Sequence, residues 1–150
     1  MKRRLAREMV ISSLYSMEIN EVQAYEALKS VIEEVMADNE VSEKISDENT
    51  NEFARKLLLG VVEHRAAIDD LLKQFLTGWQ VDRLSRVDRQ ILRLACYEMV
   101  FAEDAPPKVA VNEAIELAKH FGTDESGKFV NGVLPKLLQN LDSTKHRLVA

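Results

Sequence analysis

Apolar residues recur at the spacing of an α-helix almost everywhere along this 150-residue chain. Residues three and four apart share one face of a helix, whereas a half-buried strand would alternate apolar and polar residues strictly. No stretch of the sequence keeps that alternation. The pattern therefore predicts an all-α protein, and a hydrophobic content of 46% is sufficient for a single domain over 1–150 with its own core.

Helix ends in the first half are predicted from the apolar stripes and the residues that flank them. The first helix is expected over 3–19 and is ended by Asn20, and a second is expected over 22–39. The polar composition that follows predicts a long loop. Residues 47–76 predict either two helices or one bent helix, because Gly60 and a charged group interrupt the apolar pattern.

Capping and breaking residues mark the second half. Ser85 and Asp88 match a capping box, in which a serine and an acid three residues later bond otherwise unpaired amides at a helix start. A helix is therefore expected from there to about Phe101. Pro106 and Pro107 precede the next helix, whereas Pro135 is expected to kink or interrupt the last one. Residues 143–150 are expected to form a frayed tail.

The charges are strongly segregated although the net charge is only −5. Lys2, Arg3, Arg4 and Arg7 fall within the first seven residues, where there is no acid. Eight acids face a single base, Lys44, in the interval from 33 to 52. This arrangement favours a local polyanion site on an acidic body. The alternative is a solvated helix start followed by an ordinary acidic loop.

The usual enzyme, metal and cofactor patterns are missing from the sequence. The three histidines are far apart, the five glycines form no phosphate loop, and Cys96 is the single cysteine. Cys96 lies in an apolar segment, so we expect a buried thiol. Asp69 and Asp70 are interpreted as solvated surface acids. We therefore expect no catalytic residue, no cofactor and no metal site, and a cytoplasmic protein that does not enter a membrane.

The sequence pattern of residues 109–134 predicts two amphipathic helices joined by a tight polar corner. Glu125, Lys128 and Phe129 place an acid, a base and an aromatic ring at this corner, with no catalytic group beside them. A charged and aromatic corner without catalytic residues is typical of a binding surface. The sequence therefore predicts an interaction site here.

Three sequence blocks, in order, resemble the bacterial transcription antitermination factor NusB family over nearly the whole chain. They are the basic start leading to Leu14-Tyr15-Ser16, the segment from Val87-Asp88-Arg89 to Tyr97-Glu98, and the segment from Val111-Asn112-Glu113-Ala114 to Val133-Leu134. The resemblance implies about seven helices in two packed antiparallel bundles and a non-enzymatic role. It also implies binding of boxA RNA together with the ribosomal protein NusE, within the complex that lets RNA polymerase read through terminators, notably in ribosomal RNA operons.

Single-stranded RNA is held by cations along its backbone and by aromatic rings beneath its bases. The residues proposed for these roles are Lys2, Arg3, Arg4, Arg7, Tyr15, Phe121, Glu125, Lys128 and Phe129. The alternative for Tyr15 is a core residue with its hydroxyl at the rim, and for Phe129 it is an anchor at a helix start. The match to the family's RNA-facing positions favours RNA binding for both rings.

The resemblance places the NusE contact on acids near the helix that begins at Ser85, which are Asp82 and Asp88 here. Capping is a second role for Asp88. Leu76 and Trp79 are expected to be exposed, either toward a second copy or toward the partner, so the sequence leaves monomer and homodimer open. Two other functions remain: an RNA-binding module related to the front part of ribosomal-RNA cytosine methyltransferases, and a helical scaffold that binds only protein.

Overall fold

The computed structural model describes residues 2–37, 47–76, 81, 84–102, 105–122 and 124–149, and these residues form eight α-helices and no strand. The all-α prediction is therefore confirmed over this part of the chain. The helices divide into two compact units, Met1–Glu63 and His64–Ala150, and each is described by itself. The single-domain organisation stays a prediction.

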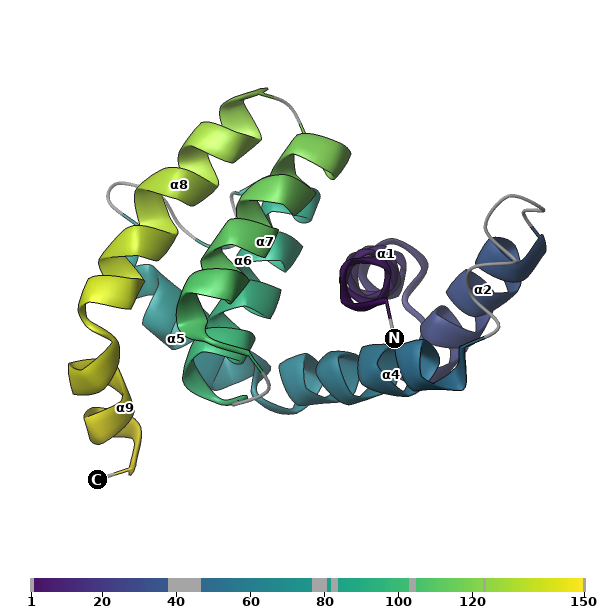
Figure 1. Ribbon diagram of the computed structural model, residues 1–150, viewed down its shortest axis with the longest axis horizontal. Coiled ribbons are helices and arrows are strands. Elements are labelled where there is room, and N and C mark those ends of the chain that lie inside the picture. The colour runs from purple at the N-terminus through teal and green to yellow at the C-terminus, as the bar shows by residue number, and fades with distance from the viewer. Residues whose placement is uncertain are drawn as a thin grey trace. The chain divides into compact units, whose positions relative to one another are not determined.

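The first unit contains α1 (Arg3–Asn20), α2 (Ala24–Ala37) and α4 (Glu48–Glu63). Each of these helices packs against the other two, and Figure 1 views α1 almost along its axis. Their inward stripes form one core, which includes Ala6, Val10, Ile11, Leu14, Leu28, Val31, Phe53, Leu57, Leu58 and Val61. In α1 the buried residues Ala6, Val10 and Leu14 are four positions apart, as one inward stripe of a helix requires.

The end of α1 agrees closely with the sequence. The helix includes Asn20 and stops at Glu21, which has a φ of 53° and is left-handed. A residue in this conformation cannot continue a right-handed helix, and in a non-glycine residue it is strained. Glu21 is exposed at this turn.

The second unit contains α5 (Arg65–Phe75), α6 (Arg86–Val100), α7 (Pro107–Phe121), α8 (Asp124–Gln139) and α9 (Leu141–Val149). Helix α6 is central, because it contacts α5, α7, α8 and α9. Every residue of α6 from Arg89 to Val100 is buried. Helices α7 and α8 run side by side and are joined by a short corner (Figure 1).

The polar side chains inside α6 have partners. Arg93 forms a bidentate pair with Asp69 of α5, with Nε–Oδ1 and Nη2–Oδ2 distances of 2.9 Å each, and also donates to Gln90. Arg89 donates to the Val81 carbonyl at 3.3 Å. A buried charge without such acceptors would be costly. The interpretation of Asp69 as a solvated acid is therefore wrong, whereas its neighbour Asp70 is exposed as expected.

The helix boundaries in the middle of the chain follow the local sequence signals. A turn at His64 separates α4 from α5, which confirms two helices rather than one bent helix. The Ser85 hydroxyl accepts a hydrogen bond from the Asp88 amide at 3.1 Å, so Ser85 caps α6. Pro107 occupies the first turn of α7, where its missing amide hydrogen leaves no bond unmade.

The C-terminal region differs from the prediction. Helix α8 runs through Pro135 to Gln139 without interruption. The carbonyl that loses its donor belongs to Asn131, an exposed position where water can reach it. After a turn at Asn140, α9 occupies 141–149, where a frayed tail was expected, and Thr144 is buried there. The described part of the chain has eight helices, which agrees with the expected number of about seven.

Candidate nucleic-acid interface

The first group of predicted RNA contacts lies at the start of α1. Lys2, Arg3 and Arg4 are exposed. The Lys2 amide donates to the Thr50 hydroxyl at 2.9 Å, and that hydroxyl donates to the Asp47 carboxylate at 3.0 Å. These bonds tie the beginning of α1 to the beginning of α4, so the cations are carried by a fixed helix end.

The placement of these cations opposes helix stability. The amino-terminal end of a helix carries a partial positive charge, which favours acids there and favours bases at the other end. Helix α1 has no acid in its first turn and no base in its last turn. The cations at its start are therefore not explained by stabilisation of the helix. Together with the helix dipole they make this end attractive to an anion such as phosphate.

Arg7 departs from the prediction of a phosphate contact. Its side chain is only 2% exposed, and its guanidinium lies 5.8 Å from the centroid of the buried Phe53 ring. Arg3 lies over the same ring at 5.0 Å but remains exposed. Arg7 falls on the inward stripe that continues through Val10 and Leu14, and this position accounts for its burial. We therefore remove Arg7 from the proposed phosphate contacts.

Tyr15 is presented on the outer side of α1. Its exposed fraction is 41%, which does not agree with the alternative of a core residue. The eleven positions from Arg4 to Tyr15 make about three helical turns, so the two side chains share a face about 16 Å apart along the axis. The exposed Arg4 and the exposed Tyr15 ring thus lie along one side of a single helix.

The second group lies at the corner between α7 and α8. A side-chain Cβ added at Gly122 would clash with the Ser126 side chain and would lie 3.0 Å from the Ala118 carbonyl oxygen. Only glycine permits this close approach. Just before it, Phe121 is partly exposed and meets the His120 ring edge to face, with centroids 4.7 Å apart. The corner is therefore tightly constructed.

The first two turns of α8 present the remaining predicted residues. Glu125 and Lys128 are exposed, and Phe129 is partly exposed. These positions and Gly132 are spaced three and four apart, so they form one outward stripe. Nothing lies within 4 Å of a Cβ built at Gly132, which leaves the stripe open. The partial exposure of Phe129 is compatible with stacking as well as with the alternative of a helix-start anchor.

The structure thus brings the predicted contacts together as two groups. Lys2, Arg3, Arg4 and Tyr15 belong to α1 in the first unit, and Phe121, Glu125, Lys128 and Phe129 belong to the corner in the second. Each group has the cations and rings that a single strand requires.

Of the two predicted partner acids, Asp82 lies outside the described residues, whereas Asp88 is located in the first turn of α6. Ser85 caps the helix through its own hydroxyl. The Asp88 Oδ1 atom is buried and accepts no hydrogen bond within the described part of the chain. The reciprocal half of the capping box is therefore not formed, and capping does not occupy this carboxylate.

The remaining predictions concern isolated side chains. Leu76 is 5% exposed, so its assignment to an exposed dimer face is wrong, and Trp79 lies outside the described residues. Cys96 is fully buried as predicted. Burial, and next the charge of Asp69, raise the pKa of the Cys96 thiol to about 12.

In the described ranges of the chain, no three His, Cys, Asp or Glu side chains gather closely enough to hold a metal ion. None of the helices found in these ranges combines the length and apolar character needed to cross a membrane.

Comparisons with known proteins cover both units. The model of the NusB family matches residues 4–139. The transcription antitermination protein NusB of Bacillus subtilis is 40% identical over 144 residues, which are 96% of this chain and 100% of that protein. NusB of T. maritima superimposes with a TM-score of 0.80 at 36% identity, covering 98% of each chain. A chain from a crystal structure of antitermination factors NusB and NusE with dsRNA has a TM-score of 0.78 and 30% identity, covering 91% of this chain and 96% of that one.

Proposed function

Because the chain belongs to the NusB family, we propose that it is a transcription antitermination factor that binds boxA RNA together with NusE. In this role it promotes read-through by RNA polymerase within the antitermination complex, notably in ribosomal RNA operons. The observation that carries the RNA part is the cluster of exposed cations at the start of α1, where the helix dipole disfavours them.

The two groups have complementary tasks in this proposal. Lys2, Arg3 and Arg4 contact phosphates, which supply affinity without reading sequence. Tyr15 stacks on a base on the same face of α1. A ring beneath an unpaired base contributes about 1 to 3 kcal/mol and tolerates any base, because every base has a π-face.

The α7–α8 corner adds contacts that depend on the RNA sequence. Phe121 and Phe129 supply further rings, and Lys128 supplies a cation for a phosphate. The Glu125 carboxylate accepts a hydrogen bond from a base edge, and such edges distinguish one base from another. The tight Gly122 turn is what sets Phe121 close to the start of α8.

The NusE surface is assigned to Asp82 and to Asp88 at the start of α6. In support, Asp88 is partly exposed in the first turn of α6. Solved structures include NusB and NusE with RNA, and this chain is similar to the NusB chain there. The proposed role is non-enzymatic and cytoplasmic.

The test is a titration of a fluorescent boxA-like single strand, with and without NusE, at several salt concentrations. Replacing Arg3 and Arg4 with alanine removes two phosphate contacts. The log–log salt slope should then fall by about 1.4, from about 0.7 per contact on a single strand. Arg7 is left unchanged because its burial would confuse packing with binding.

The matched control is Arg65→Ala. Arg65 is an exposed arginine at the start of α5 and lies outside the predicted interface. The proposal expects no change in the salt slope for this variant. Equal slopes for the wild type and the Arg3, Arg4 double variant would reject the α1 phosphate site.

A further inference from the structure

A pocket in the first unit lies between α2 and α4, away from the residues assigned to RNA. Its volume is about 310 Å³, within the range of about 300 to 1,000 Å³ of small-molecule sites. Ala24 and Leu28 of α2 and Leu58 of α4 supply apolar lining. We name it the α2–α4 pocket.

The pocket arises from second apolar stripes on both helices. In α2, Tyr25 and Ile32 are seven positions apart, and in α4 Leu59 stands beside the buried Leu58. The inward stripes of α2 and α4 pack in the core of the first unit. Tyr25, Ile32 and Leu59 lie outside these stripes, so their side chains can contact another molecule. Tyr25 is 71% exposed and Leu59 is 51% exposed. An apolar occupant would cover surface that the described chain leaves in water.

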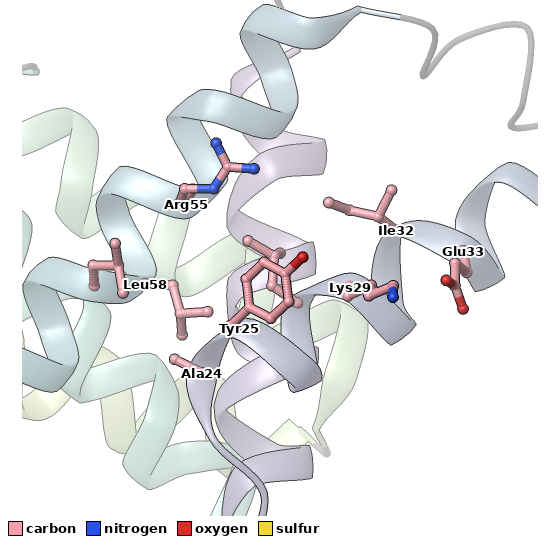
Figure 2. A pocket seen from close by; sticks show the side chains of 9 residues that line it. Ala24, Tyr25, Lys29, Ile32, Glu33, Arg55 and Leu58 are labelled. Atoms are coloured by element: carbon pink, nitrogen blue, oxygen red, sulfur yellow. The ribbon is translucent and has the colours of Figure 1, made fainter.

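The rim of the pocket is polar and mainly cationic. Figure 2 shows the Tyr25 ring standing between the two helices, with the Arg55 guanidinium on the α4 side and Lys29 on the α2 side. Lys29 makes no hydrogen bond or ion pair with any described residue. Glu33 is the one acid of the lining and lies toward the far end of α2 in this view.

Arg55 is already paired at the surface with Glu52, with side-chain exposed fractions of 48% and 67%. An exposed pair of this kind is weak. Arginine has five N–H donors, so Arg55 can bind a second carboxylate in the pocket while it keeps Glu52. Arg55, Lys29 and the Tyr25 hydroxyl can thus donate together to one anionic group.

The size of the pocket argues against a partner helix. The lining extends along α2 from position 24 to 33, about 14 Å, but along α4 only from 55 to 59, about 6 Å. A helix of three turns would extend beyond a pocket of this length. An aromatic ring system with one acidic group matches both the apolar floor and the cationic rim.

We propose that the α2–α4 pocket is a binding site for a small aromatic carboxylate. The ring lies on Ala24, Leu28 and Leu58 against the Tyr25 ring, and the carboxylate accepts hydrogen bonds from Arg55 and Lys29. The pocket is lined by none of the residues assigned to RNA or NusE. Its test is therefore separate from the test of the proposed function.

The experiment is an NMR titration of the full ¹⁵N-labelled chain with 1-naphthaleneacetate and, in parallel, with uncharged 1-naphthaleneacetamide. We expect saturable amide shifts centred on Ala24, Leu28 and Leu58. The acetamide should bind at least about threefold more weakly, because it lacks the charge that Arg55 and Lys29 recognise. Replacing both cations with glutamine should remove this preference.

Leu59→Glu tests the location, because it places a carboxylate at the mouth of the pocket. It should weaken naphthaleneacetate binding by about tenfold or more. Val62→Glu is the matched control: Val62 is an exposed apolar residue one turn further along α4 and does not line the pocket. The absence of saturable shifts, equal affinity for acetate and acetamide, or unchanged binding by Leu59→Glu would each overturn the proposal.

Discussion

Two arginines of α1 and two arginines of α6 are held in opposite ways. Arg3 and Arg4 of α1 are exposed at the end of a helix whose dipole disfavours them. Arg89 and Arg93 of α6 are buried, and each donates to an acceptor outside its own helix. The number of arginines in a helix therefore does not indicate their use. What differs between these arginines is whether the fold encloses the side chain.

The two helices also differ in how much of their surface is covered. Helix α1 buries a stripe and leaves Tyr15 and Ile19 exposed on the other side. Helix α6 is covered all round, because four helices contact it. A helix that its neighbours bury on every side stabilises the fold, whereas a helix with a solvent-exposed charged face can bind a ligand. The following predictions separate these two roles.

The largest effect is expected at Cys96, which reports the burial of α6. Its pKa is raised from an ordinary value of 9.0 to about 12, so the folded state keeps the thiol protonated at every pH below 9. The reactive thiolate is then about a thousandfold rarer than in the unfolded chain. Reaction with a chromogenic disulfide reagent at pH 8 should be slower by at least that factor when folded than in urea. Equal rates would show that α6 is not enclosed.

The next effect concerns the acceptor of Arg93. Asp69→Ala would leave the Arg93 guanidinium buried with only Gln90 as its partner. We expect the free energy of unfolding to fall by about 3 kcal/mol, since breaking a buried pair from one side leaves an unpaired charge. Urea titration measures the change. Asp70→Ala, at the exposed neighbouring position, is the control and should stay within about 0.5 kcal/mol.

Much of the fold could be predicted from local signals. The period of the apolar residues gives the helices, and Ser85 and Pro107 give two of their starts, because capping and breaking act within a single turn. The enclosure of α6 could not be predicted in this way. It depends on helices distant in the sequence, and no periodicity within α6 reveals their number.

The candidate interface could also be predicted only in part, because packing between helices that are distant in the sequence decides which side chains are buried. The exposed cations and Tyr15 lie on one helix, and they follow from its pattern. Arg7 is buried, although the sequence predicted a phosphate contact there. Its spacing from Val10 and Leu14 already places it on the buried stripe of the helix. The composition of the first seven residues indicates a cluster of cations. The position of each cation around the helix distinguishes the buried Arg7 from the exposed ones.

A smaller effect is expected for Tyr15, which tests whether the bare face of α1 binds a base. Tyr15→Ala should weaken boxA binding by about 2 kcal/mol, or about thirtyfold, through loss of stacking. Tyr15→Phe keeps the ring and should retain most of the affinity. The control is Tyr25→Ala, a more exposed tyrosine of the same unit outside the predicted interface. Fluorescence anisotropy distinguishes these outcomes, and an equal loss for both tyrosines would contradict a specific ring contact.

The smallest effect concerns stability at the start of α1. Arg4→Glu replaces a base with an acid near the positive end of the helix dipole, so the free energy of unfolding should rise by about 0.5 kcal/mol at low salt. The same change should weaken RNA binding, because a phosphate contact becomes a repulsion. Stability and affinity then move in opposite directions, as expected of a residue retained for binding.

Arg65→Glu provides the comparison for that result. Arg65 is the first residue of α5 and is also exposed, so the helix dipole predicts a similar gain in stability. Its RNA affinity should remain that of the wild type. If Arg4→Glu and Arg65→Glu affect RNA binding equally, the loss reflects overall charge and not a site on α1. If only Arg4→Glu loses affinity, the exposed Arg4 of α1 contacts phosphate, in contrast to the buried Arg89 and Arg93 of α6.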